Sequence, residues 1–441
     1  MERSVFDALK DRGFIYQATH GDEIRRAIDG PPITFYLGID PTADSLHIGH
    51  FFALMMFRHL QEAGHKGILV IGGATALVGD PSGKSDLRKL LSKEEVERNL
   101  EEVKTLAKRF IKGDGDNPAL ILNNADWINP CSYIDFMRDI GIHFNVNTML
   151  AAETYAKRLE EGGLTFLEMG YMLMQAYDFV YLNRKYGCIL QIGGSDQWGN
   201  IVAGVNLGRK LNYLDEIDEN EVDKMFGLTN PLLMTKDGKK MGKTEQGTLW
   251  VARKKTTVFD FYQYFYNVND EDTEMLLKLF TSLPSEQIEE KCENDIVAAK
   301  RLMAYEITKL VHGSGEADKA IAAVSALFGK STDLDNVQSI GRLTGKVEST
   351  SSITGSLTVT SAPSCKIDRD LLANGINIVD LLTLTKFLPS KSEARRVIQQ
   401  GGVAVNGRKI ENVEVIVDLN SVDNGYILLK KGKKTFLKVY H

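Results

Sequence analysis

The chain has few cysteines and no long apolar run. Its 441 residues include four scattered cysteines, Cys131, Cys188, Cys292 and Cys365. They form no close pair and no metal-binding spacing, which indicates reduced thiols rather than a disulfide framework. No run of 18 apolar residues is present, and no basic segment precedes an apolar one at the start, so we expect neither membrane spanning nor secretion. A hydrophobic content of 43% is typical of a large soluble globular protein, for which the cytoplasm is the expected compartment.

Two familiar nucleotide-binding fingerprints are also missing. The pattern Gly-x-Gly-x-x-Gly occurs nowhere, which argues against a hydride-transferring enzyme that binds a dinucleotide. Gly83-Lys84-Ser85 resembles the end of a P-loop, but Val78 stands where that motif needs its first glycine. Nucleotide binding by another route remains open.

The most informative stretch is residues 33–50. Apolar and other residues alternate along 33–40, which predicts a strand with Tyr36, Gly38 and Asp40 on one face. An apolar run over 46–60 predicts a helix directly after it.

The start of that helix carries two histidines. Asp44 or Ser45 can cap it, which places His47 and His50 in its first turn. Free N–H groups at a helix start attract anions, so a phosphate is one candidate ligand. On the sequence alone, capping, core packing or a zinc pair completed by further ligands remain alternatives.

Further apolar runs predict a parallel sheet. They cover 67–71, 119–122 and 188–192, each is followed by a turn rich in Gly or Asn, and helical patterns such as 93–113 lie between them. This alternation predicts a doubly wound α/β fold. Ligands of such sheets bind beyond the carboxyl ends of the strands, where Asp40, residues 72–80 and Asn123 fall.

Two polar groupings lie farther along the chain. Tyr171, Gln175 and Asp178 are spaced i, i+4 and i+7, so they form one helical stripe that either faces solvent or binds a small polar ligand. Residues 236–243 hold four lysines among glycines. That run is either a solvated loop or a mobile loop whose ammonium groups follow transferring phosphates.

The last part of the chain changes character. Residues 256–329 have helical patterns, and 331–365 are rich in Ser, Thr and Gly, which predicts a linker. Helices are then expected over 371–387 and 392–400, and strands near 403–405, 410–417 and 426–429. Residues 366–441 hold 13 Lys and Arg against 8 Asp and Glu, although the whole chain has a net charge of −6. This basic end suggests contact with RNA or DNA, with a solvated charged face as the alternative, and Lys391, Arg395 and Arg396 predict a phosphate-binding surface.

Three motifs together carry a resemblance to a known family. His47-Ile-Gly-His50 and Lys240-Met-Gly-Lys-Thr244 are similar to the two signatures of class I aminoacyl-tRNA synthetases, and residues 389–407 resemble an S4 RNA-binding domain. The chain as a whole resembles the bacterial tyrosyl-tRNA synthetases. This resemblance implies a homodimer and four regions: a Rossmann-like parallel-sheet catalytic domain (1–225), the lysine-rich signature loop with an α-helical tRNA-binding domain (226–330), a linker (331–365) and a small α+β S4-like domain (366–441).

The resemblance also implies a reaction. L-tyrosine and ATP, with Mg²⁺ expected, would form tyrosyl-adenylate and pyrophosphate, and tyrosine would then pass to the 3′ end of tRNA(Tyr). Tyr36 and Asp178 favour a phenol as the ligand. The alternatives are a tryptophanyl-type enzyme, a nucleotidyltransferase of the same superfamily and a synthetase-derived RNA-binding protein without aminoacylation activity.

Each functional residue expected from the resemblance matches a family position. The catalytic set is Thr42, His47, His50, Lys240, Lys243 and Thr244. The tyrosine-binding set is Tyr36, Asp80, Tyr171, Gln175 and Asp178. The ATP-binding set is Gly38, Asp40, His47, His50, Lys84, Arg88, Gly194, Asp196, Gln197 and Lys243. RNA binding falls to Lys391, Arg395 and Arg396, and no protein-held metal is expected.

Overall fold

The structure is a computed structural model in which the chain forms two compact units. It describes residues 4–82, 91–161, 163–215, 224–244, 247–328, 364–423, 425–432 and 435–441. One unit comprises Met1–Thr256 with Tyr264–Val311, and the other comprises Thr257–Gln263 with His312–His441.

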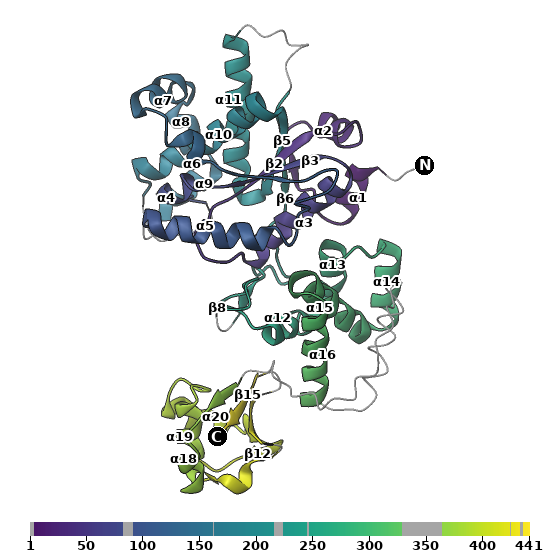
Figure 1. Ribbon diagram of the computed structural model, residues 1–441, viewed down its shortest axis with the longest axis vertical. Coiled ribbons are helices and arrows are strands. Elements are labelled where there is room, and N and C mark those ends of the chain that lie inside the picture. The colour runs from purple at the N-terminus through teal and green to yellow at the C-terminus, as the bar shows by residue number, and fades with distance from the viewer. Residues whose placement is uncertain are drawn as a thin grey trace. The chain divides into compact units, whose positions relative to one another are not determined.

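A six-stranded sheet organises the first unit (Figure 1). Its order is β1 (Gln17–Ala18), β6 (Phe226–Asn230), β5 (Cys188–Gly194), β2 (Thr34–Ile39), β3 (Lys66–Ile71) and β4 (Leu120–Asn123). β1 pairs antiparallel with β6, and the other five strands run parallel. The predicted parallel sheet is therefore confirmed. The strand order reverses between β2 and β5, and ligands of such sheets bind at this switch point.

Helices account for most of the remainder of the chain up to residue 328. They are α1 (Val5–Asp11), α2 (Gly21–Ile28), α3 (Ile48–Glu62), α4 (Thr75–Val78), α5 (Lys93–Ala107), α6 (Ala125–Ile128), α7 (Tyr133–Asp139), η1 (Gly141–His143), α8 (Val146–Leu150), α9 (Glu153–Glu161), α10 (Phe166–Tyr186), η2 (Ser195–Gln197), α11 (Trp198–Leu214), α12 (Val258–Tyr266), α13 (Asp270–Phe280), α14 (Ser285–Asn294), α15 (Ile296–His312) and α16 (Ser314–Phe328). Two short strands, β7 (Lys243–Thr244) and β8 (Gly247–Thr248), pair with each other. The helical character predicted after residue 256 is confirmed.

The two faces of β2 pack on different helices, as its alternating residues predict. Phe35 lies edge-on to Phe57 of α3, with ring centroids 4.8 Å apart. Tyr36 contacts Phe179 of α10, with centroids 5.3 Å apart. The face that carries Tyr36, Gly38 and Asp40 is thus the face that α10 covers.

The N-terminal cap of α3 differs from the prediction. The helix begins at Ile48, and the Nδ1 atom of His47 accepts the backbone N–H groups of Gly49 and His50 at 3.1 and 3.2 Å. The expectation that Asp44 or Ser45 caps this helix is therefore wrong. Each of these has another partner, because Asp44 forms ion pairs with two lysines and the Ser45 hydroxyl accepts the N–H of Ala252.

The end of the chain folds around its own apolar core. A five-stranded sheet has the order β12 (Arg408–Ile410), β11 (Val403–Val405), β14 (Ile427–Lys431), β15 (Thr435–Tyr440) and β9 (Ser364–Lys366), and β10 (Ile376–Asn377) pairs with β13 (Ile416–Val417). The helices are α18 (Arg369–Ala373), α19 (Ile378–Leu384) and α20 (Lys391–Gln399).

Two boundaries in this region were predicted wrongly. The helix expected over 371–387 is divided into α18 and α19 because Gly375 adopts a φ of +76° between them. The strand expected over 410–417 is two short strands, β12 and β13.

Within the residues that the structure describes, no helix combines the length and the apolar character that crossing a bilayer requires.

Candidate active site

The predicted polar residues converge at the carboxyl end of the parallel sheet. Asp40 follows β2, and the hydroxyl of Tyr171 on α10 donates to its Oδ2 at 3.0 Å. Gly38 is exposed although it lies in the central strand, and none of the described residues brings an atom within 4 Å of the position that a Cβ would take there. A hollow therefore lies beside Gly38, near the carboxyl end of β2, on the face that α10 covers.

A buried carboxyl group defines one end of the site. Asp178 is only 4% exposed, and its two oxygens accept the indole N–H of Trp127 at 2.7 Å and the side-chain amide of Asn124 at 3.0 Å. Burial raises the pKa of Asp178 to about 7, although both hydrogen bonds act in the opposite direction. Burial, and then the nearby Asp178, raise the pKa of Tyr36 well above its ordinary value, so Tyr36 stays a neutral phenol.

Among the buried oxygens that lack a hydrogen-bond partner within the described parts of the chain, three lie on β2, β5 and α10. They are the hydroxyl of Tyr36 and the side-chain carbonyls of Gln175 and Gln191. Gln191 stands opposite Tyr36 in the register of β5 and β2. Since buried polar atoms are normally paired, these atoms mark a place for a polar ligand. Sequence reasoning missed Gln191, although a single glutamine in an otherwise apolar strand was a usable signal.

A chain of hydrogen bonds connects Asp178 with Asp40. The side-chain amide of Asn124 donates both to Asp178 and to the hydroxyl of Thr75, each at 3.0 Å. Thr75 in turn donates to Oδ1 of Asp40 at 2.7 Å. The turn after β3 can come this close to Asp40 only because residue 72 is a glycine. A Cβ at that position would lie 2.0 Å from Oδ1 of Asp40. The sequence did not single out Thr75, Asn124 or Trp127, since only the fold places the turns after β3 and β4 beside α10.

Asp80 forms a second polar group with the end of β5. The side-chain amide of Gln197 donates to Asp80 and to the hydroxyl of Ser82, both at 2.7 Å, and Ser82 is also hydrogen-bonded to Asp80. The contact of Gln197 with adenosine stays a prediction. Asp196 follows Gly194 nearby, and burial, together with Asp80, raises the pKa of Asp196 while Lys240 acts to lower it.

The start of α3 presents two stacked imidazoles. The rings of His47 and His50 are 3.7 Å apart and nearly parallel. Because Nδ1 of His47 accepts backbone N–H groups, the ring proton resides on Nε2, which can donate to an anion. His47 is therefore both the cap of the helix and a potential donor to a phosphate.

The lysine loop, of which residues 233–244 and 247–249 are described, lies directly against this helix start. Backbone bridges join Met234 to Lys240 and join His47 to Trp250. Gly242 has a φ of +86°, and a Cβ there would lie 2.3 Å from Cγ2 of Ile48. The structure thus brings together the two motifs that the sequence separates by about 190 residues.

Some predicted residues can be placed only in part. Lys84 and Arg88 lie outside the described residues, as do the side chains of Lys243 and Thr244. Thr42 is exposed in the loop after β2.

The predicted RNA-binding residues lie on α20. Lys391 forms an ion pair with Asp380, and Arg396 forms one with Glu393, both at 2.7 Å. Both cations are mainly exposed, and exposed ion pairs contribute little, so a phosphate can displace either partner.

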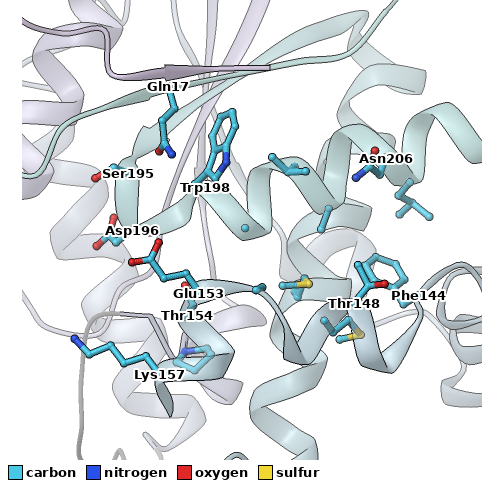
Figure 2. A pocket seen from close by; sticks show the side chains of 18 of the residues that line it. Gln17, Phe144, Thr148, Glu153, Thr154, Lys157, Ser195, Asp196, Trp198 and Asn206 are labelled. Atoms are coloured by element: carbon cyan, nitrogen blue, oxygen red, sulfur yellow. The ribbon is translucent and has the colours of Figure 1, made fainter. Parts of the chain in front are cut away.

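A cavity of about 740 Å³ adjoins the candidate site (Figure 2). Ser195 and Asp196 lie at one end, and Phe144 and Asn206 lie at the other. Three cations, Lys157, Arg158 and Lys210, line it together with the indole of Trp198. Sequence reasoning missed this cavity because its lining comes from several separate elements.

Comparison with known proteins identifies the family. The model for class I tRNA synthetases (W and Y) matches residues 29–329, and that for the SYY-like C-terminal domain of tyrosine–tRNA ligases matches 357–439. The tyrosine–tRNA ligase of Acetivibrio thermocellus is 44% identical over 439 residues, covering 99% of each chain. That of Clostridium tetani is 45% identical over 442 residues, covering 100% of this chain and 99% of the relative. The chain belongs to the tyrosine–tRNA ligase family.

Solved structures of this family share the fold. A C-terminally truncated mitochondrial tyrosyl-tRNA synthetase from Aspergillus nidulans is 30% identical, with a TM-score of 0.65 over 74% of this chain and 94% of its own. Membership confirms the predicted class I fold and the predicted enzyme class, an aminoacyl-tRNA synthetase. The two relatives that match over nearly the whole chain are both named tyrosine–tRNA ligase, which argues against the tryptophanyl-type alternative.

Proposed function

We propose that this member of the tyrosine–tRNA ligase family activates L-tyrosine with ATP and transfers it to tRNA(Tyr). The observation that carries the proposal is the pair formed by buried Asp178 and the hydroxyl of Tyr36, which has no partner among the described residues, on the face of β2 where a hollow lies beside Gly38. A phenol can donate to Asp178 and accept from Tyr36. Phenylalanine would leave the buried hydroxyl of Tyr36 unpaired and would bring no donor to the buried carboxylate of Asp178, which is costly.

The opposite end of tyrosine carries an ammonium group. Asp80, Tyr171 and Gln175 are the proposed partners, because Asp80 is 9% exposed and the carbonyl of Gln175 is buried without a partner among the described residues. Tyr171 is held by Asp40, so its hydroxyl oxygen points a lone pair rather than its proton toward a ligand. An ammonium group, which only donates, matches these acceptors.

Activation is one displacement at phosphorus. The tyrosine carboxylate attacks the α-phosphorus of ATP, a carboxyl oxygen–phosphorus bond forms, and the bond to the β-phosphate oxygen breaks to release pyrophosphate. No enzyme nucleophile is required, so the chain must align the reactants and stabilise charge on the leaving group. We assign this role to His47, His50 and Lys240, together with Thr42, Lys84, Arg88, Lys243 and Thr244.

The remaining nucleotide contacts are assigned to adenosine. We place adenosine near Gly38, Gly194 and Asp196. The described residues contain no group of three or more side chains able to hold a metal ion, so Mg²⁺ would enter with the phosphates of ATP rather than in a protein cage.

Transfer requires the terminal ribose of tRNA to reach the adenylate. A ribose hydroxyl attacks the tyrosyl carbonyl carbon, and AMP leaves. The cavity lined by Lys157, Arg158, Lys210 and Trp198 begins at Asp196, so we propose that it receives the last nucleotides of tRNA. Residues 1–225 then form the catalytic domain, 226–330 hold the lysine loop and tRNA-contacting helices, and 366–441, with Lys391, Arg395 and Arg396, bind RNA. The proposed linker is 331–365, of which 331–363 lie outside the described residues.

The proposed cavity role predicts a selective loss. We expect Lys157→Ala to raise the KM for tRNA about threefold to tenfold, because each phosphate contact contributes a salt-dependent share of binding. Pyrophosphate exchange, which needs no tRNA, should be unchanged. An equal loss in both assays would contradict the assignment of the cavity to tRNA.

We also propose a homodimer. Large apolar side chains are exposed on elements that follow one another from α7 to the start of α10: Tyr133, Ile134, Ile142, Val146, Phe166 and Leu167, of which Ile142 is 74% and Phe166 70% exposed. Phe136 of α7 packs against a core cluster that contains Met149 of α8, so these two helices are neighbours. Such grouped apolar exposure is typical of an interface. Sedimentation of the full chain at a mass of one protomer at micromolar concentration would refute it.

Exchange of labelled pyrophosphate into ATP tests the function directly. We expect exchange with tyrosine and none with phenylalanine or tryptophan, followed by tyrosine transfer to tRNA(Tyr). No exchange with tyrosine would favour a synthetase-derived RNA-binding protein. Equal exchange with tryptophan would favour the tryptophanyl-type enzyme.

A further inference from the structure

Two side chains hold the lysine loop from outside the residues assigned so far. The hydroxyl of Tyr264, near the end of α12, accepts the backbone N–H of Gly242 at 2.8 Å. Oδ1 of Asp272, in the first turn of α13, accepts the backbone N–H of Lys236 at 2.8 Å. One bond therefore lies near each end of the segment that carries the exposed lysines.

Asp272 belongs to a helix, α13, that packs on α3 and is hydrogen-bonded to Arg12 at the end of α1. It is 1% exposed, and Phe280 at the other end of α13 stacks on Phe51 of α3, with centroids 4.8 Å apart. The guanidinium of Arg12 donates to the backbone carbonyls of Lys278 and Thr281, each at 2.8 Å. α3 begins at the His47 cap, so α13 has a defined position relative to the two histidines.

Both anchors bind main chain, which leaves the lysine side chains available. Residues 236–240 are exposed, and their turn is closed by the bond from the N–H of Thr235 to the carbonyl of Lys239 at 2.8 Å. Oδ2 of Asp272 has no partner among the described residues, so this buried carboxyl group is used through a single acceptor atom. The contact therefore positions the loop backbone and does not neutralise a lysine.

We propose that Tyr264 and Asp272 are positioning residues that hold the backbone of the lysine loop in a fixed position beside His47 and His50. The inference rests on the proposed function for its kinetic consequence. A loop without anchors must be ordered again in each turnover, which lowers the fraction of bound substrate that is aligned for reaction. The geometry of the anchors is independent of which amino acid is activated.

Limited proteolysis tests the anchoring without any activity. Trypsin cleaves after lysine, and the loop of the ligand-free full-length protein offers Lys236, Lys239 and Lys240. We expect Tyr264→Phe and Asp272→Ala each to raise the rate of cleavage in this loop about threefold to tenfold, the equivalent of one lost hydrogen bond. Asp272→Asn keeps a carbonyl acceptor and should retain protection.

Matched variants control for non-specific effects. Tyr213→Phe removes a hydroxyl from a residue that is 83% exposed, and Glu271→Ala removes the exposed carboxylate beside Asp272. Both should leave cleavage unchanged. Unchanged cleavage in Tyr264→Phe and Asp272→Ala would overturn the proposal. So would equal cleavage in Asp272→Asn and Asp272→Ala.

Kinetics then show whether the anchoring serves catalysis. We expect Tyr264→Phe and Asp272→Ala to lower kcat of pyrophosphate exchange about threefold to tenfold with an unchanged KM for tyrosine, and Asp272→Asn to be close to the unaltered protein. A thermal unfolding midpoint within about 2 °C of that of the unaltered protein shows that a lower kcat does not come from a folding defect. If Asp272→Ala does not fold, Tyr264→Phe alone tests the proposal. An unchanged kcat refutes the positioning role, whereas absence of exchange in the unaltered protein refutes the proposed function and leaves the proteolysis result standing.

Discussion

Asp178→Ala is expected to lower kcat/KM for tyrosine about a thousandfold in pyrophosphate exchange, with a change in KM for ATP of less than about threefold. The substitution removes the proposed acceptor for the substrate phenol, and it also removes the partner of the indole N–H of Trp127 and of the amide of Asn124. The substrate phenol would then be buried without its charged acceptor, at a cost of roughly 4 kcal/mol, or three powers of ten. ATP is assigned to the other end of the hollow, which explains the selectivity.

Asp126→Ala is the matched control, because Asp126 is an exposed carboxylate next to Trp127. It should behave like the unaltered protein. Equal losses for tyrosine and ATP in Asp178→Ala would show that the residue maintains the fold rather than selecting the phenol.

The pH profile gives a second signature of the same group. Burial raises the pKa of Asp178 to about 7 in the ligand-free protein, and the substrate phenol can donate only to the ionised carboxylate. We therefore expect kcat/KM for tyrosine to fall as the pH drops below about 7. In Asp178→Asn, which has no carboxylate to protonate, this fall should be absent.

The sequence predicted well whatever depends on local periodicity. The alternation along β2, the apolar runs of β3 and β5 and the stripe of Tyr171, Gln175 and Asp178 are properties of short segments, so strands, helices and their faces followed from residue spacing. The end of β2 and the start of α3 were found because strand, turn and helix are contiguous.

What the sequence did not reveal depends on long-range packing. The relay from Asp178 through Asn124 and Thr75 joins turns after different strands to α10, and each residue alone has the composition of an ordinary turn. The cap of α3 was misjudged because Asp44 is taken by lysines about 210 residues later, which no local rule foresees. Tyr264 and Asp272 likewise act on the lysine loop only after α13 packs on α3.

Gly242→Ala is expected to lower kcat of tyrosine activation about a hundredfold while KM for tyrosine changes less than about threefold. The residue has a φ of +86°, which costs an L-amino acid about 1 kcal/mol, and its Cβ would lie 2.3 Å from Cγ2 of Ile48. Overpacking of this kind costs about 1–3 kcal/mol more. The cheapest relief is withdrawal of the loop from α3, which carries Lys240 away from the phosphates without disturbing the tyrosine pocket.

Gly238→Ala separates strain from collision, because Gly238 also has a positive φ, +75°, but none of the described residues comes within 4 Å of its Cβ position. It should lose less than about tenfold. Adding Ile48→Ala to Gly242→Ala removes the methyl group with which the new Cβ collides. The kcat of the double variant should therefore be about tenfold higher than the kcat expected if the effects of the two single substitutions simply multiplied. An equal kcat for Gly242→Ala and Gly238→Ala would contradict this account, because it would show that close packing on Ile48 does not hold the lysine loop against the two histidines. The loop would then be held by Tyr264 and Asp272 alone.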